Sequence, residues 1–245
     1  MKILVVNLKK TLLFAVCPIL ALAFFASAFV VNINYKDAIY IGTNGEINAE
    51  KLVIIDPGHG GEDPGAVGVN GSLEKDLNLE ISLLVGEELV KSGYTVIYTR
   101  TEDKLLYKPE ENIKGIRKIS DLKNRCKIAE EYPSATFVSI HMNSFAQEKY
   151  SGMQVYSALK NADSRLLAEK IQKSVKTSLQ PENKRVVKEG RGIYILENVS
   201  NKAVLIECGF LSNSEECAKL SEKEYQKQLS FSIVCGIIEY DKAIN

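Results

Sequence analysis

The sequence has no excess of either charge, because 31 Lys and Arg residues balance 31 Asp and Glu residues. Such a chain has no net field that attracts nucleic acid or an anionic membrane surface, so a nucleic-acid partner is not expected. Internal repeats and low-complexity tracts are also lacking. With 45% hydrophobic and 25% charged residues among 245, the composition is that of a folded globular domain.

Cysteines are few, and none forms a CxxC pair that would indicate a metal or redox motif. Cys17 lies in an apolar N-terminal segment, and the other four are scattered through the chain. Buried free thiols are the favoured interpretation, although a disulfide between Cys208 and Cys217 stays open. These four residues are Cys126, Cys208, Cys217 and Cys235.

The N-terminal segment has the pattern of a targeting signal. Three lysines among the first ten residues precede an uncharged apolar stretch at 11–31, which includes a small-residue motif at 26–28. The stretch is also about 20 residues long, enough to span a bilayer, so both a cleaved signal peptide and a membrane anchor remain open for residues 1–31. Residues 32–50 are interpreted as a linker and 51–241 as the catalytic domain, located outside the cytoplasm.

Short apolar runs and helical patterns alternate through this domain. The helix at 77–89 has Asp76 as a candidate cap and Gly93 as a terminator. This alternation predicts an α/β fold, with a mainly parallel or mixed twisted sheet of about six strands and helices on both faces. Ligand sites of such sheets gather at the carboxyl ends of the strands. The expected strands are 51–55, 94–99, 135–140, 153–157, 193–196 and 203–206, and further helices are expected at 121–131, 162–179 and 222–240.

The chain contains only two histidines, and each directly follows a predicted strand. His59 lies in the sequence DPGHGG, and His141 lies in VSIHMN. One such histidine is more often a packed or surface residue than a ligand, but two in matching positions favour a shared metal ion. Catalytic zinc commonly takes three protein ligands, which leaves one carboxylate to find.

Glu74, at the start of the helix after the glycine-rich loop, is a candidate third ligand. Spacing alone makes it equally a solvated charge at a helix N-terminus. Glu62, Asp63 and Glu80 are rivals on the same argument. The loop itself has neither the GK[ST] of a phosphate-binding loop nor the GxGxxG of a dinucleotide loop, so its glycines indicate a tight turn around an ion.

Glu207 ends an otherwise apolar predicted strand, in the sequence AVLIEC. Burial of an unpaired carboxylate costs several kcal/mol, so this residue needs a partner or a function. An ion pair with a nearby Arg or Lys is one interpretation. The other is a general base that takes a proton from a water activated by the metal.

Together these blocks resemble the zinc-dependent N-acetylmuramoyl-L-alanine amidases of bacterial cell walls, the Amidase_3 family. The resemblance covers residues 51 to about 240 and runs in the family's order. Its blocks are IDPGHGG at 55–61, DPGA at 63–66, Glu74, Thr99-Arg100, SIHMN at 139–143 and ECGFLSN at 207–213.

The resemblance implies that His59, Glu74 and His141 hold zinc and that Glu207 is catalytic, which selects Glu74 over its rivals. It implies hydrolysis of the amide between the lactyl group of N-acetylmuramic acid and the L-alanine of the stem peptide. The glycan strand and stem peptide of peptidoglycan are then the substrate, for which Asn143 and Arg191 are candidate binding residues. A catalytically silent wall-binding or regulatory domain, and a zinc peptidase acting within the stem peptide, are the alternatives.

Two departures from the family concern partners. The segment 104–120 is longer than the family pattern and highly charged, which indicates a substrate lip, a surface for an envelope activator protein or a tolerated insertion. The stretch 143–151 is too short for the inhibitory helix of some division amidases. The absence of wall-binding modules, with the N-terminal segment, resembles the spore-cortex amidases of endospore formers, which implies a role in muramic-δ-lactam formation, sporulation and germination.

Overall fold

The computed structural model describes residues 39–41, 49–107, 109–113 and 115–244. The predicted leader at 1–31 and most of the predicted linker at 32–50 lie outside these residues, so the choice between signal peptide and membrane anchor stays a prediction, as do the domain limits. Within the described ranges, no helix is both long enough and apolar enough to cross a membrane.

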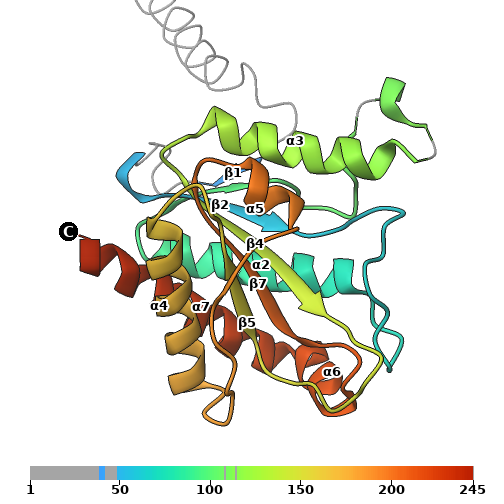
Figure 1. The fold of residues 1–245 in the computed structure, drawn as a ribbon, viewed down its shortest axis with the longest axis vertical. Coiled ribbons are helices and arrows are strands. Elements are labelled where there is room, and N and C mark those ends of the chain that lie inside the picture. Colours follow the sequence, from blue (N-terminus) through green and yellow to red (C-terminus); the bar gives the residue numbers. More distant parts are fainter. Residues whose placement is uncertain (1–38, 42–48, 108, 114, 245) are drawn as a thin grey trace, which may run out of the picture. The chain divides into compact units, whose positions relative to one another are not determined.

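The described residues form one seven-stranded sheet in the order β1-β3-β2-β4-β7-β5-β6 (Figure 1). Strands β3, β2, β4 and β7 run parallel, whereas β1 pairs antiparallel with β3 and β5 pairs antiparallel with β7. The predicted mixed, mainly parallel sheet is thus confirmed. Its strands are β1 (Ile39–Ile41), β2 (Leu52–Pro57), β3 (Thr95–Tyr98), β4 (Thr136–Asn143), β5 (Gln154–Ser157), β6 (Lys188–Glu189) and β7 (Lys202–Phe210).

The strand predicted at 193–196 is wrong, because this run forms the short helix α5 (Tyr194–Asn198). A short apolar run does not by itself distinguish a buried strand from a buried helical turn. Ile195 and Leu196 are buried in the core that α5 shares with α3. The two short outer strands β1 and β6 were not predicted, because three and two residues are too few to show a period.

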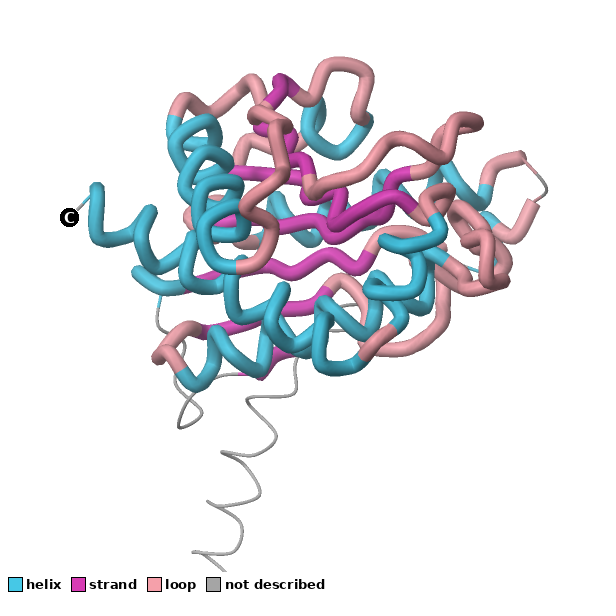
Figure 2. The backbone as a smooth tube through the Cα atoms, turned by 90° about the horizontal axis from the view of Figure 1, so that it is seen from below, coloured by secondary structure: helices cyan, strands magenta, loops and turns pink. Residues whose placement is uncertain are grey.

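Helices cover both faces of the sheet, as predicted (Figures 1 and 2). Alternate residues of β2 enter opposite cores, since Val53 and Ile55 pack with one set of helices and Leu52 and Ile54 with the other. The larger core contains α2 (Glu74–Lys91), α4 (Asp163–Ser178), α6 (Ser214–Ser221) and α7 (Lys223–Ile244). The smaller core contains α3 (Arg117–Glu131) and α5, and two short 3-10 turns lie at Ala49–Lys51 and Pro109–Glu111.

The predicted helix boundaries hold in part. Helix α2 begins at Glu74 after the N-cap Leu73, so Asp76 lies in the first turn and is not the cap. Gly93 follows the end of α2 with φ 84°, a conformation that suits glycine and matches its predicted role as terminator. Helix α3 begins at Arg117, four residues before the predicted 121, and α6 was not predicted.

All four cysteines of the described domain are free thiols, which agrees with the favoured interpretation and excludes the Cys208–Cys217 disulfide in this structure. Cys126, Cys208 and Cys217 are buried. Burial raises the pKa of the Cys208 thiol, so this side chain behaves as a small apolar residue of the core.

Candidate metal centre

The two histidines meet because β2 and β4 are neighbouring parallel strands. His59 follows β2, whereas His141 lies within β4 near its carboxyl end. Gly58 donates its backbone N–H to the Ile140 carbonyl at 3.0 Å, which fixes the start of the loop against β4. A Cβ atom at Gly58 would lie 2.2 Å from the His141 ring, so only glycine fits here. His59 thus follows its strand nearly as predicted, whereas β4 continues past His141 to Asn143.

Glu74 reaches the histidines because the loop 58–73 folds back on itself. The Glu74 N–H donates to the Ala66 carbonyl at 2.9 Å, and the Ala66 N–H donates to Glu74 Oε2 at 2.8 Å. The Met142 N–H donates to Glu74 Oε1 at 3.0 Å. Only 4% of Glu74 is exposed, so its carboxylate is fixed inside the protein and is not a solvated helix charge.

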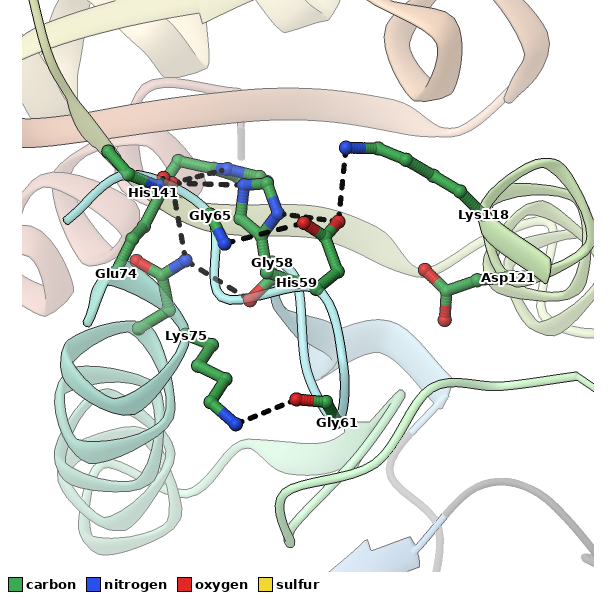
Figure 3. Close-up of polar contacts among 12 residues, drawn as sticks. Gly58, His59, Gly61, Gly65, Glu74, Lys75, Lys118, Asp121 and His141 are labelled. Atoms are coloured by element: carbon green, nitrogen blue, oxygen red, sulfur yellow. Dashed lines mark hydrogen bonds and ion pairs between the residues drawn. The ribbon is translucent and has the colours of Figure 1, made fainter. Parts of the chain in front are cut away.

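One carboxylate oxygen lies between the two rings (Figure 3). Glu74 Oε1 is 3.2 Å from His59 Nε2 and 3.0 Å from His141 Nδ1. The ring centroids are 5.0 Å apart, and potential ligand atoms of all three residues lie within 4.8 Å of one another. Two imidazoles and a carboxylate in this arrangement form a cluster that can hold a metal ion.

The rival acidic residues have other partners. Asp63 Oδ2 lies 2.9 Å from His59 Nδ1, the ring nitrogen that faces away from Glu74, and 3.1 Å from Lys118 Nζ. Glu62 forms an ion pair with Arg117. Glu80 lies 2.6 Å from Lys223 Nζ and also accepts from Gln226. Asp63 is therefore the residue that orients His59, a role the sequence did not reveal.

The charges of the cluster depend on one another. Burial alone raises the pKa of Glu74, but hydrogen bonds from His141 and His59 outweigh it and hold this pKa far below its usual range. Burial alone lowers the pKa of His59, yet its hydrogen bonds to Asp63 and Glu74 raise it to about 9. The carboxylates are thus ionised, and they favour a positive charge at the place where the two rings meet.

Glu207 lies on β7 beside this cluster, directly paired with His141 of β4. Its Oε2 atom is buried without a hydrogen-bond partner, and no Lys or Arg forms an ion pair with it in the described part of the chain. Burial raises the pKa of Glu207 to about 7; His141 and His59 partly oppose this shift, and Glu74 adds to it. The ion-pair interpretation of Glu207 is therefore not supported.

The two candidate substrate residues lie apart from the cluster. Asn143 ends β4 opposite Phe210, and its carbonyl accepts the Leu211 N–H at 2.8 Å. Arg191 is exposed and donates from Nε to Glu189 at 2.8 Å. In the described part of the chain, neither side chain forms a hydrogen bond or ion pair with a member of the metal cluster.

A buried ion-pair network joins α3 to the end of β2 and to the loop that bears His59. Arg125 of α3 donates to Asp56 at 2.6 Å, to Asp121 at 2.8 Å and to the His59 carbonyl at 2.8 Å. Asp56 also accepts from Thr99 and Ser139. Sequence reasoning missed this network, although Asp56 gave the same signal as Glu207, an acid at the end of an apolar strand.

Comparison with known proteins identifies the family. The model of the Amidase_3 family, described as N-acetylmuramoyl-L-alanine amidase, matches residues 53–239, most of the chain. The chain belongs to this amidase family. It is accordingly an N-acetylmuramoyl-L-alanine amidase, a hydrolase that acts on peptidoglycan and hence in the cell envelope, outside the cytoplasm.

Similar amidases include a protein of Bacillus subtilis described as the germination-specific N-acetylmuramoyl-L-alanine amidase. It is 38% identical over 192 residues, which cover 78% of this chain and 79% of that protein. A solved structure of the CwlD amidase from Clostridioides difficile in complex with the GerS lipoprotein is 41% identical, with a TM-score of 0.76 over 80% of this chain and all of that chain. An amidase structure from Clostridium difficile 630 is 29% identical, with a TM-score of 0.70 and coverages of 80% and 100%.

Proposed function

We propose that this amidase uses zinc to hydrolyse the amide between the lactyl group of N-acetylmuramic acid and L-alanine, with Glu207 as general base and then general acid. The observation that carries the proposal is the convergence of His59, Glu74 and His141 beside a buried carboxylate that has no partner. A purely wall-binding domain has no need of such an arrangement.

The donor set fits zinc. Ligand bonds of about 2.0–2.1 Å in a tetrahedral site place ligand atoms roughly 3.3 Å apart. The contacts of 3.2 Å and 3.0 Å between the ring nitrogens and Glu74 Oε1 are close to this spacing. When bound, zinc supplies Lewis acidity that polarises the scissile carbonyl and activates the attacking water.

The residues around the cluster have separate roles in this reaction. Asp63 fixes the orientation of the His59 ring through Nδ1, which leaves Nε2 directed toward Glu74. Glu207 takes a proton from the attacking water and passes it to the departing amine. A pKa of about 7 suits both steps, because such a group can both accept and release a proton near neutral pH. Asn143 and Arg191 are proposed to bind the glycopeptide along the sheet edge.

Product analysis tests this function directly. Purified protein with zinc is incubated with peptidoglycan fragments, and the products are identified by mass spectrometry. We expect free stem peptides with an intact L-alanine amino terminus. Cleavage between stem amino acids would instead identify a zinc peptidase, and binding of fragments without any product would identify a silent wall-binding domain.

We further propose a role in the spore cortex, where removal of stem peptides precedes formation of muramic δ-lactam. Its support is the 38% identity to the protein described as a germination-specific amidase. Deletion of the gene in the source organism is expected to abolish muramic δ-lactam in spore muropeptides. Unchanged lactam content would contradict this role and leave the amidase activity intact.

An envelope activator protein is proposed to contact segment 104–120. The related amidase in complex with a lipoprotein supports this proposal, and so does the exposure of three isoleucines in the segment. Arg117 and Lys118 join the segment to Glu62 and Asp63 beside His59, so a bound protein would act on the metal centre. The isoleucines are Ile113, Ile116 and Ile119. Equal zinc content and turnover with and without envelope proteins would contradict the proposed activator.

A further inference from the structure

Three aromatic rings form a group at the carboxyl edge of the sheet, outside the metal cluster. Phe210 is fully buried beneath the other two rings. Its ring centroid is 5.8 Å from that of Phe145 and 6.3 Å from that of Tyr150. The Phe145 and Phe210 planes differ by only 23°. Phe145 is 54% exposed and Tyr150 is 37% exposed, so these two rings present an apolar surface to solvent.

This pair, called here the aromatic platform (Phe145 and Tyr150), lies on the catalytic side of the sheet. His141 pairs with Glu207, and after a bulge Asn143 pairs with Phe210. Residues two apart on β4 point to the same face, and paired residues share a face, so Phe210 and Glu207 lie on one side. Two residues along a strand span about 7 Å, so Phe210, beneath the platform, lies about this far along the sheet from the metal cluster.

The loop that bears the platform is held in place. Four hydrogen bonds fix residues 144–152 to the turn between β7 and α6, to α6 itself and to the segment before β6; the loop lies near α6 in Figure 1. A pre-organised aromatic surface loses little conformational entropy on binding. The bonds join the Phe145 N–H to Ser212 Oγ at 3.0 Å, Asn213 Nδ2 to the Glu148 carbonyl at 2.7 Å, Arg185 Nε to the Ser151 carbonyl at 2.6 Å, and the Gly152 N–H to Glu216 Oε1 at 2.8 Å.

We propose that Phe145 and Tyr150 form a sugar subsite, which stacks against the apolar face of the N-acetylhexosamine ring next to the muramic acid whose amide is cleaved. This inference rests on the proposed function, because it places the reacting amide at the cluster. The platform then lies farther along the sheet edge than the metal cluster, where it contacts the neighbouring sugar.

The chemistry of the surface favours a pyranose ring. A pyranose carries C–H groups on its faces and hydroxyl and acetamido groups around its rim, so it matches an exposed aromatic ring with polar surroundings. The two rings of the platform lie 5.4 Å apart and are tilted by 54°, so they form a shallow angle against which one sugar can lie. Such polar groups flank the platform, since Asn143 lies beside it and the exposed Glu148 and Lys149 belong to the same loop. Exposed aromatic surface beside a catalytic site is typical of a ligand-binding groove.

The platform and the segment proposed to bind an activator lie at different places in the site. Segment 104–120 contacts the glycine-rich loop after β2, whereas the platform rests on β7. Since β4 lies between β2 and β7 in the sheet, the cluster separates the two surfaces. A glycan strand can therefore occupy the platform without displacing a protein bound at the segment.

Two substrates and three variants test the subsite. The substrates are an N-acetylmuramoyl dipeptide and a trisaccharide in which the same muramoyl dipeptide has N-acetylglucosamine on both sides. We expect Phe145→Ala combined with Tyr150→Ala to lower kcat/KM roughly tenfold for the trisaccharide, mainly through KM, and to leave the monosaccharide unchanged. Phe145→Tyr combined with Tyr150→Phe should retain the preference for the longer substrate.

Phe231→Ala is the matched control, because Phe231 is an exposed aromatic on α7, away from the site, and should change neither rate. Zinc content and Tm of each variant are measured in parallel. Equal losses on both substrates, or no loss on either, would overturn the sugar subsite while the wild-type protein still cleaves both. If the wild-type protein cleaves neither, the proposed function itself is wrong.

Discussion

At the scale of single residues, Glu207 differs from the other buried acids of the site. Asp56, Asp63 and Glu74 each have positively charged or hydrogen-bonding partners, whereas Oε2 of Glu207 has none in the described structure. A carboxylate kept in such a position destabilises the fold when it is ionised. This cost is explained if the group must exchange protons during the reaction.

Replacement of Glu207 by Gln is expected to lower kcat by roughly 10²–10⁴-fold, the usual contribution of a general base. Zinc content should be unchanged, and the free energy of unfolding should not fall, since the neutral amide removes a buried charge. Metal analysis, urea unfolding and turnover on one preparation check this. Glu239→Gln, at an exposed site on α7, serves as the control. Full activity of Glu207→Gln would refute the proposed mechanism.

Asp63→Asn tests the orienting contact to His59. Loss of the carboxylate behind a metal-bound imidazole typically weakens metal binding about 10–100-fold. We expect a decrease of this size in zinc affinity, measured by competition with a chromophoric chelator. Glu62→Gln is the matched variant, because Glu62 lies in the same loop but pairs with Arg117. Equal affinities in the two variants would show that Asp63 has no such role.

The residues of the site were predictable to different degrees. His59 and His141 were found because both follow apolar runs of the sequence, and the carboxyl ends of parallel strands lie at the same edge. Glu74 needed the family resemblance, since the fold of a loop through Gly65 and Ala66 is not encoded in spacing. Asp63 was predicted as a rival ligand, and only the direction of the His59 ring shows that it binds the other nitrogen.

At the scale of secondary structure elements, the buried pair of Asp56 and Arg125 joins β2 to α3. The same guanidinium donates to the His59 carbonyl, so α3 fixes the position of the loop that bears the ligand. Burial alone raises the pKa of Asp56, but Arg125, Thr99 and Ser139 outweigh it and hold this pKa below its usual range. The pair therefore links the stability of the smaller core to the geometry of the metal centre.

Asp56→Asn is expected to cost about 3–5 kcal/mol of unfolding free energy at pH 7, because Arg125 then lacks a buried partner. The pKa of Asp56 is lower in the folded state, so its contribution is present above the unfolded pKa of about 3.9 and is lost as pH falls through the folded value. Wild-type stability should thus fall on acidification more steeply than that of the variant. Urea unfolding of chelator-treated protein from pH 7 to pH 3 measures both curves, and parallel curves would contradict the assignment.

Elements with long apolar patterns were predictable, and short ones were not. The patterns of β2, β4 and α2 span enough residues to show their period, whereas α5 has only five residues and β6 only two. In α5, Ile195 and Leu196 are buried by packing against α3, a tertiary effect that the sequence pattern does not contain. The error at 193–196 thus follows from the shortness of the element.

At the scale of the whole molecule, the proposed metal ligands come from the loop after β2, from α2 and from β4, which belong to distant parts of the sequence. A metal ion held by all three binds the folded state and not the unfolded chain. At a free zinc concentration of 100 times Kd, this linkage adds about 2.7 kcal/mol to stability. For a domain of this size, about 2–4 °C per kcal/mol corresponds to a rise in Tm of roughly 5–10 °C.

Chelation of zinc should therefore lower Tm by roughly 5–10 °C, and addition of Zn²⁺ but not of Mg²⁺ should restore it, because imidazole ligands select against Mg²⁺. His141→Ala, which removes one ligand, should have a Tm that neither chelator nor zinc changes. Differential scanning calorimetry with and without chelator makes the comparison. A wild-type Tm that is indifferent to chelation, or an equal response in His141→Ala, would mean that His59, Glu74 and His141 do not hold the ion together.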